Sequence, residues 1–175
     1  MNMDDMVLIS VDDHLIEPPN MFDRHTPAKF KGQMPKIVQG PQGEDMWMIG
    51  NMPVPNIALN AVAGRRPEEY GFEPTGFAQL RKGTYDVHSR IGDMNVNGQL
   101  AGLNFPSFVG VGGQTLEKVQ DRELGLAIVR AWNDWHIDEW CGAYPGRFIP
   151  VGIVSNWDPI AAAEEVRRIA KKGCY

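Results

Sequence analysis

The stretch Ile9-Ser10-Val11-Asp12-Asp13-His14-Leu15-Ile16-Glu17-Pro18-Pro19 is the most informative part of this sequence, because an apolar run leads directly into an Asp-x-His pair. Residues 7–11 predict a short buried strand of the kind found in parallel sheets. In a strand, side chains two residues apart share a face, so Asp12 and His14 should point the same way. A carboxylate and an imidazole that converge at the end of a buried strand form half of a metal site.

The composition is typical of one soluble globular domain. The chain has 175 residues, of which 43% are hydrophobic and 22% charged, and this is enough to build a real core. A net charge of −5, with no basic cluster, argues against a nucleic-acid partner. No apolar run reaches the roughly 20 residues that span a bilayer, and no basic segment marks a signal peptide. The two cysteines form no paired framework, so we expect a reduced, cytoplasmic protein.

Residues 15–85 form a long, proline-rich excursion after the first strand. They contain no long periodic segment, and a hairpin is predicted within them from residues 36–38, a Gly-Pro-Gln-Gly turn and residues 46–49. About 70 residues are too many for a simple connection. We therefore expect this segment to be a functional excursion over a binding face.

Beyond residue 85, strands and helices alternate. Each predicted strand is followed by a helix, which is the pattern of parallel βα units, and three such units are present. Gly173-Cys174-Tyr175 resembles the start of a fourth strand. The predicted elements are a helix from Asp86 to Asn97, a strand over 100–106, a helix over about 116–141, a strand over 147–154, and a helix from Asp158 to Lys172.

Four blocks in this order carry a family resemblance: residues 9–18, the run Arg-Ile-Gly-Asp-Met-Asn-Val-Asn-Gly over 90–98, Asn-Asp-Trp over 133–135, and Pro-Gly-Arg-Phe-Ile-Pro-Val over 145–151. The sequence resembles the amidohydrolase-related metal-dependent hydrolases, in the branch that includes the aminocarboxymuconate-semialdehyde and resorcylate decarboxylases. The resemblance implies an α/β fold of the (β/α)₈ TIM-barrel type, with the active site at the C-terminal ends of the strands. Residues 1–175 would be the N-terminal part of one such domain, truncated to about the first three βα units.

The same resemblance implies that Asp12 and His14 are the metal ligands of the first strand, although many relatives have His at the first of these positions. The later His and Asp ligands of the family would lie beyond residue 175. Zn²⁺ suits this donor pair best, and Mn²⁺ or Fe²⁺ are alternatives. In the structural alternative, Asp12 only caps a turn and His14 is a hydrogen-bonded buried histidine.

Two kinds of function remain open. The first is a metal-dependent enzyme that acts on a small carboxylated or aromatic substrate, by hydrolysis of an amide, ester or lactone or by non-oxidative decarboxylation. The second is a catalytically incomplete fragment or split-gene half that needs a partner chain, either another copy or a complementary C-terminal half. Three βα units leave strand edges and helix faces uncovered, which favours such association.

Two residues next to the pair are further candidates. Strand alternation predicts that Asp13 points away from the pocket and braces the motif by a hydrogen bond. Glu17 could orient the His14 ring, or it could be a surface or turn carboxylate.

The remaining candidates lie farther along the chain. His25, in the excursion, could reach the mouth of the pocket or lie on the surface. Ser107 follows the second strand, and Asn156 and Trp157 follow the third, where a barrel places its pocket residues. Each of these three could contact substrate, cap a helix or pack in the core.

Overall fold

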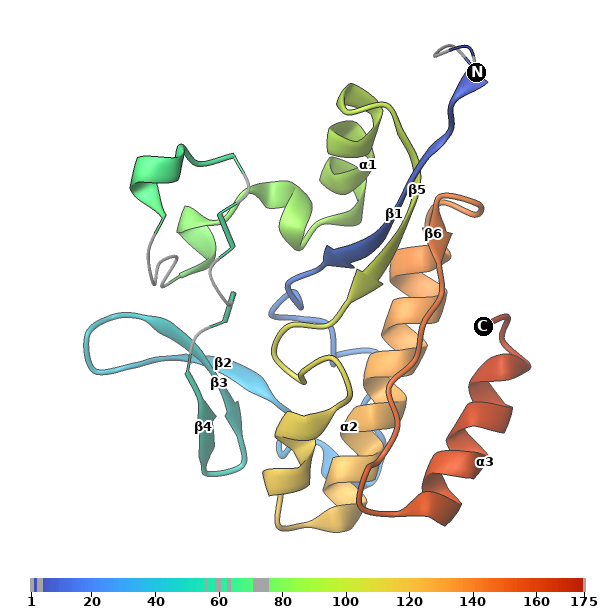
Figure 1. The fold of residues 1–175 in the computed structure, drawn as a ribbon. Helices are drawn as coiled ribbons and strands as arrows, with labels where there is room; N and C mark the ends of the chain where they lie inside the picture. The colour runs from blue at the N-terminus through green and yellow to red at the C-terminus, as the bar shows by residue number, and fades with distance from the viewer. Residues whose placement is uncertain are drawn as a thin grey trace.

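The computed structural model describes residues 2, 5–55, 57–58, 61–62, 64–70 and 76–174 and shows an α/β fold with a parallel sheet. This sheet has the strand order β1-β5-β6, and both strand pairs are parallel, so the predicted class of sheet is confirmed (Figure 1). Pro74 and Tyr175 lie outside the described residues. The strands of the parallel sheet and the helices around it are β1 (Leu8–His14), α1 (Val87–Val96), β5 (Gln99–Phe105), α2 (Arg122–Trp135), a π-helical turn (His136–Cys141), β6 (Phe148–Ile149) and α3 (Pro159–Ala170).

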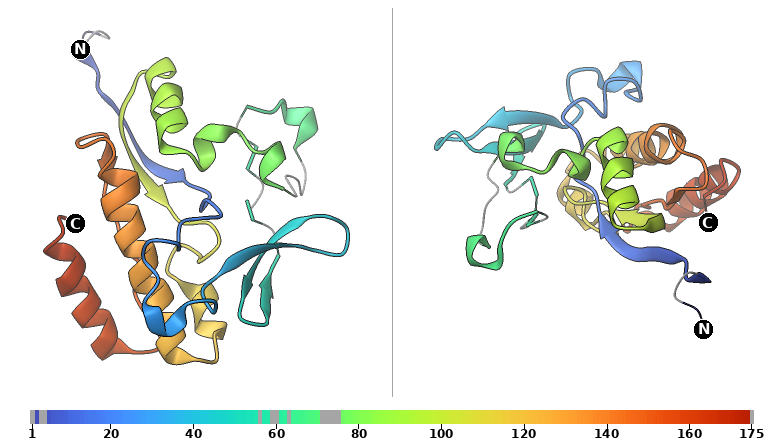
Figure 2. Two further views of the ribbon diagram at one scale, coloured as in Figure 1. Left: turned by 180° about the vertical axis from the view of Figure 1, so that it is seen from behind. Right: turned by 90° about the horizontal axis from the view of Figure 1, so that it is seen from above.

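The excursion contains the predicted hairpin and supplies part of the core. The strands β2 (Lys36–Gln39) and β3 (Asp45–Ile49) pair antiparallel, and β4 (Met52–Val54) extends the sheet. Trp47 of β3 is fully buried, and its ring stacks on Phe108 with 4.5 Å between centroids. In both views of Figure 2, α2 lies between this antiparallel sheet and α3.

Each α-helix begins at an aspartate whose side chain accepts hydrogen bonds from the first turn. Asp86, Asp121 and Asp158 cap α1, α2 and α3 in this way. The prediction that the second helix begins near residue 116 is wrong by one and a half turns, because Asp121 sets its start. The residues before it form one of several short 3₁₀ turns, which span Ala28–Phe30, Pro67–Glu69, Phe77–Gln79, Lys82–Thr84 and Gln114–Lys118.

The third strand is much shorter than the predicted span of residues 147–154. β6 ends at Ile149, and the next residue, Pro150, has no N–H to donate to a neighbouring strand. Farther along, the backbone N–H and C=O of Ile153 bond to the side chain of Asn133. After α3, Gly173 closes a turn on Ala170, and neither Gly173 nor Cys174 belongs to a strand of the described chain.

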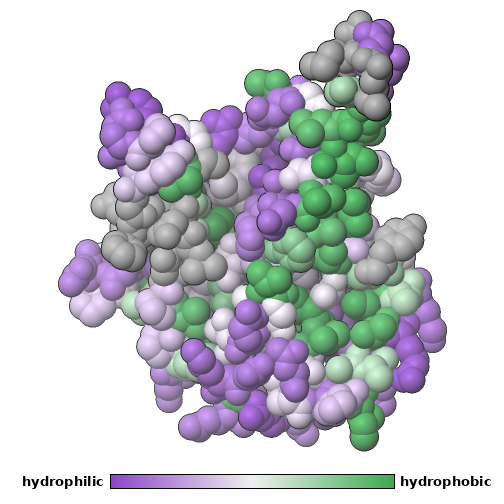
Figure 3. Space-filling model, in the orientation of Figure 1, coloured by the Kyte–Doolittle hydropathy of each residue, from purple (hydrophilic) through white to green (hydrophobic). Residues whose placement is uncertain are grey.

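The prediction that the first strand is buried is wrong. Leu8, Ile9 and Val11 are 54%, 46% and 67% exposed. The strand lies at the sheet edge, where β5 is its neighbour on one side only. An apolar surface follows the course of β1 in the space-filling view (Figure 3). A continuous aliphatic run is typical of a strand buried on both faces. In the described structure, however, much of β1 is exposed to solvent.

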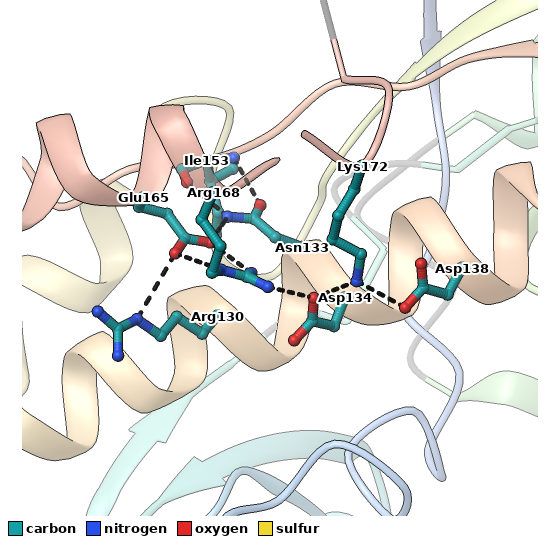
Figure 4. A network of polar contacts seen from close by, with 8 residues as sticks. All are labelled: Arg130, Asn133, Asp134, Asp138, Ile153, Glu165, Arg168 and Lys172. Atoms are coloured by element: carbon teal, nitrogen blue, oxygen red, sulfur yellow. Dashed lines mark hydrogen bonds and ion pairs between the residues drawn. The ribbon is translucent and has the colours of Figure 1, made fainter. Parts of the chain in front are cut away.

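A buried polar network joins α2 to α3. Asn133 is fully buried, and its amide nitrogen donates to Glu165 at 2.8 Å. Arg168 contacts both Glu165 and Asp134 at 2.7 and 2.6 Å, and Lys172 also reaches Asp134 (Figure 4). Since buried carboxylates and amides must be hydrogen-bonded, this network fixes how the two helices pack.

Candidate active site

A cavity of about 430 Å³ lies at the carboxyl ends of β1 and β5. This is the end of a parallel sheet where ligands bind in α/β proteins, because loops and side chains converge there. Its described lining combines charged, hydroxyl and small apolar side chains. They are Asp12, Asp13, His14, Ile16, Ala58, Ala61, Val62, Thr84, Arg90 and Ser107.

Asp12 and His14 share this cavity. The Nδ1 atom of His14 lies 3.3 Å from the carbonyl oxygen of Pro106. Because a carbonyl only accepts hydrogen bonds, this contact requires the proton on Nδ1 and leaves the Nε2 lone pair for a ligand. Metal-bound histidines are held in this way, by a hydrogen bond from the other ring nitrogen. A carboxylate and an imidazole with Nε2 available are donor types that suit a divalent cation. Both residues are exposed, however, and no cluster of three or more potential ligands occurs among the described residues.

A β-bulge shapes the end of β1. The register runs from Ser10 opposite Gly102 to Asp13 opposite Asn104, so two residues of β1 face one residue of β5. Asp13 therefore lines the cavity together with its neighbours, which strict alternation did not predict. Its Oδ2 also accepts a hydrogen bond from Gln99 at 3.0 Å, which ties β1 to β5.

Glu17 lies behind the cavity and is fully buried, so a surface position is excluded. Its oxygens do not bond to His14. They accept hydrogen bonds from the backbone N–H groups of Ser107 and Phe108 at 3.1 and 3.0 Å and from the indole of Trp132 at 3.1 Å. Burial raises the pKa of Glu17, and these hydrogen bonds oppose the rise. Glu17 therefore positions the loop that follows β5 rather than the His14 ring.

Ser107 lines the cavity while being almost completely buried itself. Its hydroxyl donates to the carbonyl of Leu15 at 2.7 Å. Together with the bonds of Glu17, this contact joins the segment that directly follows His14 at the end of β1 to the segment after β5, which carries the acceptor of His14, Pro106.

Arg90 of α1 was not a candidate on sequence grounds, yet it lines the cavity. Its Nη2 donates to the carbonyl oxygen of His14, and burial lowers the pKa of its guanidinium. Asp13 and Asp93 oppose this effect electrostatically. No spacing rule links an arginine on the first helix to a motif 76 residues earlier, so only the folded chain reveals the contact.

Three predicted candidates lie away from this cavity. His25 pairs with Glu139, with 2.7 Å between its Nε2 atom and the carboxylate Oε1, and it lines a different cavity. Asn156 donates to the carbonyl of Gly112 at 3.0 Å and so braces a loop. Trp157 packs over Gly125 of α2 and beneath the guanidinium of Arg122. The sheet pairing of the third strand stops at Ile149, well before Asn156, and so does not place these side chains beside β1.

A larger cavity of about 650 Å³ lies elsewhere, beside the N-terminal end of α1 and the π-helical turn. It is lined by Arg24, His88, Asp138 and Glu139 among others. It contains none of the predicted metal ligands, so the smaller cavity is the candidate active site.

In a comparison with solved structures, sixteen chains match this one. One is an amidohydrolase from Mycobacterium avium subsp. paratuberculosis K-10, with 26% identity and a TM-score of 0.68 over 97% of this chain. This likeness supports the amidohydrolase superfamily. The chain spans about half, 48%, of that protein's length. No protein-family model and no protein of curated function matches the chain, and no described helix is both long and apolar enough to cross a membrane.

Proposed function

We propose that this chain carries the first-strand portion of a metal-dependent hydrolase site on a (β/α)₈-type barrel, in which Asp12 and His14 bind a divalent cation. The observation that supports this most directly is the contact between His14 Nδ1 and the Pro106 carbonyl, which leaves Nε2 available as a ligand. Zn²⁺ is the preferred ion, with Mn²⁺ or Fe²⁺ as alternatives. A bound cation would supply Lewis acidity that polarises a substrate oxygen.

The residues around the ligand pair have separate tasks in this proposal. Pro106 sets the tautomer of His14, while Glu17 and Ser107 hold the loop that carries Pro106. A cavity of about 430 Å³ admits a small molecule. Both hydrolysis and non-oxidative decarboxylation of a small carboxylated or aromatic substrate are compatible with these groups.

A matched pair of double variants tests the metal ligands. The sequence contains a second Asp-x-His, Asp23-Arg24-His25, outside the candidate cavity. We expect Co²⁺ and Zn²⁺ to bind the purified chain, and D12N/H14Q to weaken binding by at least about tenfold. The D23N/H25Q control should bind like the unmodified chain. Equal losses in both variants, or unchanged binding by D12N/H14Q, would refute the assignment.

A second proposal is that the chain functions only in association with a partner, either another copy or a complementary C-terminal half. The exposed apolar side chains of Leu8, Ile9 and Val11 on an edge strand support it, because such an edge favours pairing with another chain. Light scattering after size exclusion tests for self-association. A monomer that unfolds cooperatively and binds metal by itself would contradict this proposal.

A further inference from the structure

We propose that Arg90 is a positioning residue for His14, because its guanidinium holds the His14 backbone carbonyl from the open edge of the sheet and thereby fixes the direction of the imidazole. This role deepens the proposed function and rests on it for the assignment of His14 as a metal ligand. The contact itself can be tested without metal, so the two proposals can fail separately.

The carbonyl of His14 lies on the open side of β1. The N–H of the next residue, Leu15, donates to the Phe105 carbonyl at 3.0 Å, and the Leu15 carbonyl accepts from the Ser107 hydroxyl at 2.7 Å. Successive residues of an extended strand direct their backbone polar groups to opposite sides, so the His14 carbonyl points away from β5. In the described sheet β5 is the neighbour of β1 on one side only. Nη2 of Arg90 donates to this carbonyl and so supplies the hydrogen bond that a neighbouring strand would give.

The guanidinium reaches His14 from a helix whose own position is fixed. The side chain of Asp86 caps α1, and the backbone N–H of Arg90 donates to the Asp86 carbonyl at 2.9 Å. On the same helix, Ile91 and Met94 are buried in the core. The donor therefore comes from a rigid element, which holds a functional group in place better than a loop does.

The two carboxylates that act on the charge of Arg90 form hydrogen bonds with other residues. Asp93 accepts hydrogen bonds from both Nε and Nη2 of Arg81, and Asp13 accepts one from Gln99 at 3.0 Å. Both carboxylates interact with Arg90 electrostatically. A guanidinium most often forms its hydrogen bonds with carboxylates, whereas Nη2 of Arg90 donates to the backbone of the candidate ligand residue.

The imidazole of His14 needs this support. His14 is exposed, and the contact of its Nδ1 with the Pro106 carbonyl, at 3.3 Å, is longer than most N–H···O hydrogen bonds. A ring held by one long bond keeps its direction only if the backbone that carries it is fixed. Loss of a partner that orients a metal-binding histidine weakens metal binding by about 10–100-fold.

The first test follows the His14 ring in the metal-free chain by ¹⁵N NMR, at a pH of about 8, where an ordinary histidine is neutral. The His14 signals are identified by their absence in D12N/H14Q. We expect a single tautomer with the proton on Nδ1 in the unmodified chain, and signals averaged over both tautomers in R90Q. R90K keeps a charged donor that can reach the carbonyl, so it should keep the single tautomer.

The matched control is R147Q. Arg147 also donates to backbone carbonyls of this sheet, those of Gln99 and Leu100 at the opposite end of β5, so its replacement should lower stability without altering the His14 signals. A single His14 tautomer in folded R90Q would overturn the proposal. If R90Q does not fold, the unmodified chain decides the question, because a held guanidinium gives separate Nη–H signals and a freely rotating one would refute the contact.

The second test measures Co²⁺ affinity. R90Q should bind Co²⁺ at least about tenfold more weakly, R90K should stay within about threefold of the unmodified chain, and R147Q should bind like it. Loss of the positive charge alone predicts the opposite, since a guanidinium repels a nearby cation. Unchanged or tighter binding by folded R90Q would therefore refute the positioning role while the metal site stands. If the unmodified chain binds no Co²⁺ but R90Q loses the single tautomer, the metal site is refuted and the hold of Arg90 on His14 is supported.

Discussion

Replacement of Glu17 by alanine or glutamine should show how the loop after β5 is held in place. The carboxylate accepts three hydrogen bonds, from the Ser107 and Phe108 backbone N–H groups and from the Trp132 indole. All three donors approach a residue with no exposed surface, so water cannot replace the lost acceptor without rearrangement. The two variants therefore measure how much this buried acceptor contributes to the stability of the fold.

The expected loss follows from the donors that are left without a partner. Each buried unsatisfied donor costs about 1–3 kcal/mol, and Glu17→Ala leaves three such donors without their acceptor. Glu17→Ala should thus lower the free energy of unfolding by about 3–5 kcal/mol. Glu17→Gln should lose about 1–3 kcal/mol, because its amide nitrogen faces the N–H of Phe108 whereas its oxygen keeps the other two bonds.

The effect of Glu17→Gln should depend on pH. Burial raises the pKa of Glu17 above its ordinary value of 4.5, so the folded chain binds this proton more tightly than the unfolded chain. The contribution of Glu17 to stability is therefore full at low pH and falls as pH rises from 4.5 through the raised pKa. Glutamine does not titrate, so the stability difference between the unmodified chain and Glu17→Gln should narrow as pH rises.

Urea unfolding at several pH values between about 4.5 and 8, followed by tryptophan fluorescence and far-ultraviolet circular dichroism, measures this difference. Glu164→Gln, on the exposed face of α3, is the matched control and should change stability by less than about 0.5 kcal/mol. A difference that stays constant or widens with pH would show that burial does not govern the Glu17 carboxyl. A loss below about 1 kcal/mol for Glu17→Ala would refute the account of the three donors.

Two further predictions concern the second helix and the turn that follows it. Asn133→Ala should cost about 2–4 kcal/mol in urea unfolding, since it removes both side-chain bonds to the Ile153 backbone. Asp138→Ala should cost less than about 1 kcal/mol, because the Asp138 side chain is half-exposed in its ion pair with Lys172. Equal losses in the two variants would contradict the role of burial. Burial lowers the pKa of His136 to about 4, so the contribution of His136 to stability should decline as pH falls from 6.5 towards 4. The imidazole NMR signals of His136 should therefore stay constant above about pH 5.5. A titration midpoint near pH 6.5 would be inconsistent with a neutral buried ring.

The sequence alone determined the order of the main strands and helices and several of their boundaries. The caps at Asp86 and Asp158 and the turn between β2 and β3 are encoded by residues close together in the chain, since caps and turns depend on local hydrogen bonds and backbone preferences. Strand–helix alternation likewise predicted parallel pairing of β1 with β5. The sequence also placed Asp12 and His14 at the end of the first strand.

Only the tertiary structure decided which distant groups meet. Glu17 reaches Trp132 across 115 residues, and Arg90 reaches His14 across 76; no periodicity in a single segment specifies such contacts. The exposure of β1 and the bulge before Asp13 are further outcomes of sheet assembly, because burial and register depend on which strands pair. The Asp-x-His pair is thus a property of the sequence, but the cavity around it, with an arginine that bonds to the His14 carbonyl and a buried glutamate behind it, exists only in the folded chain.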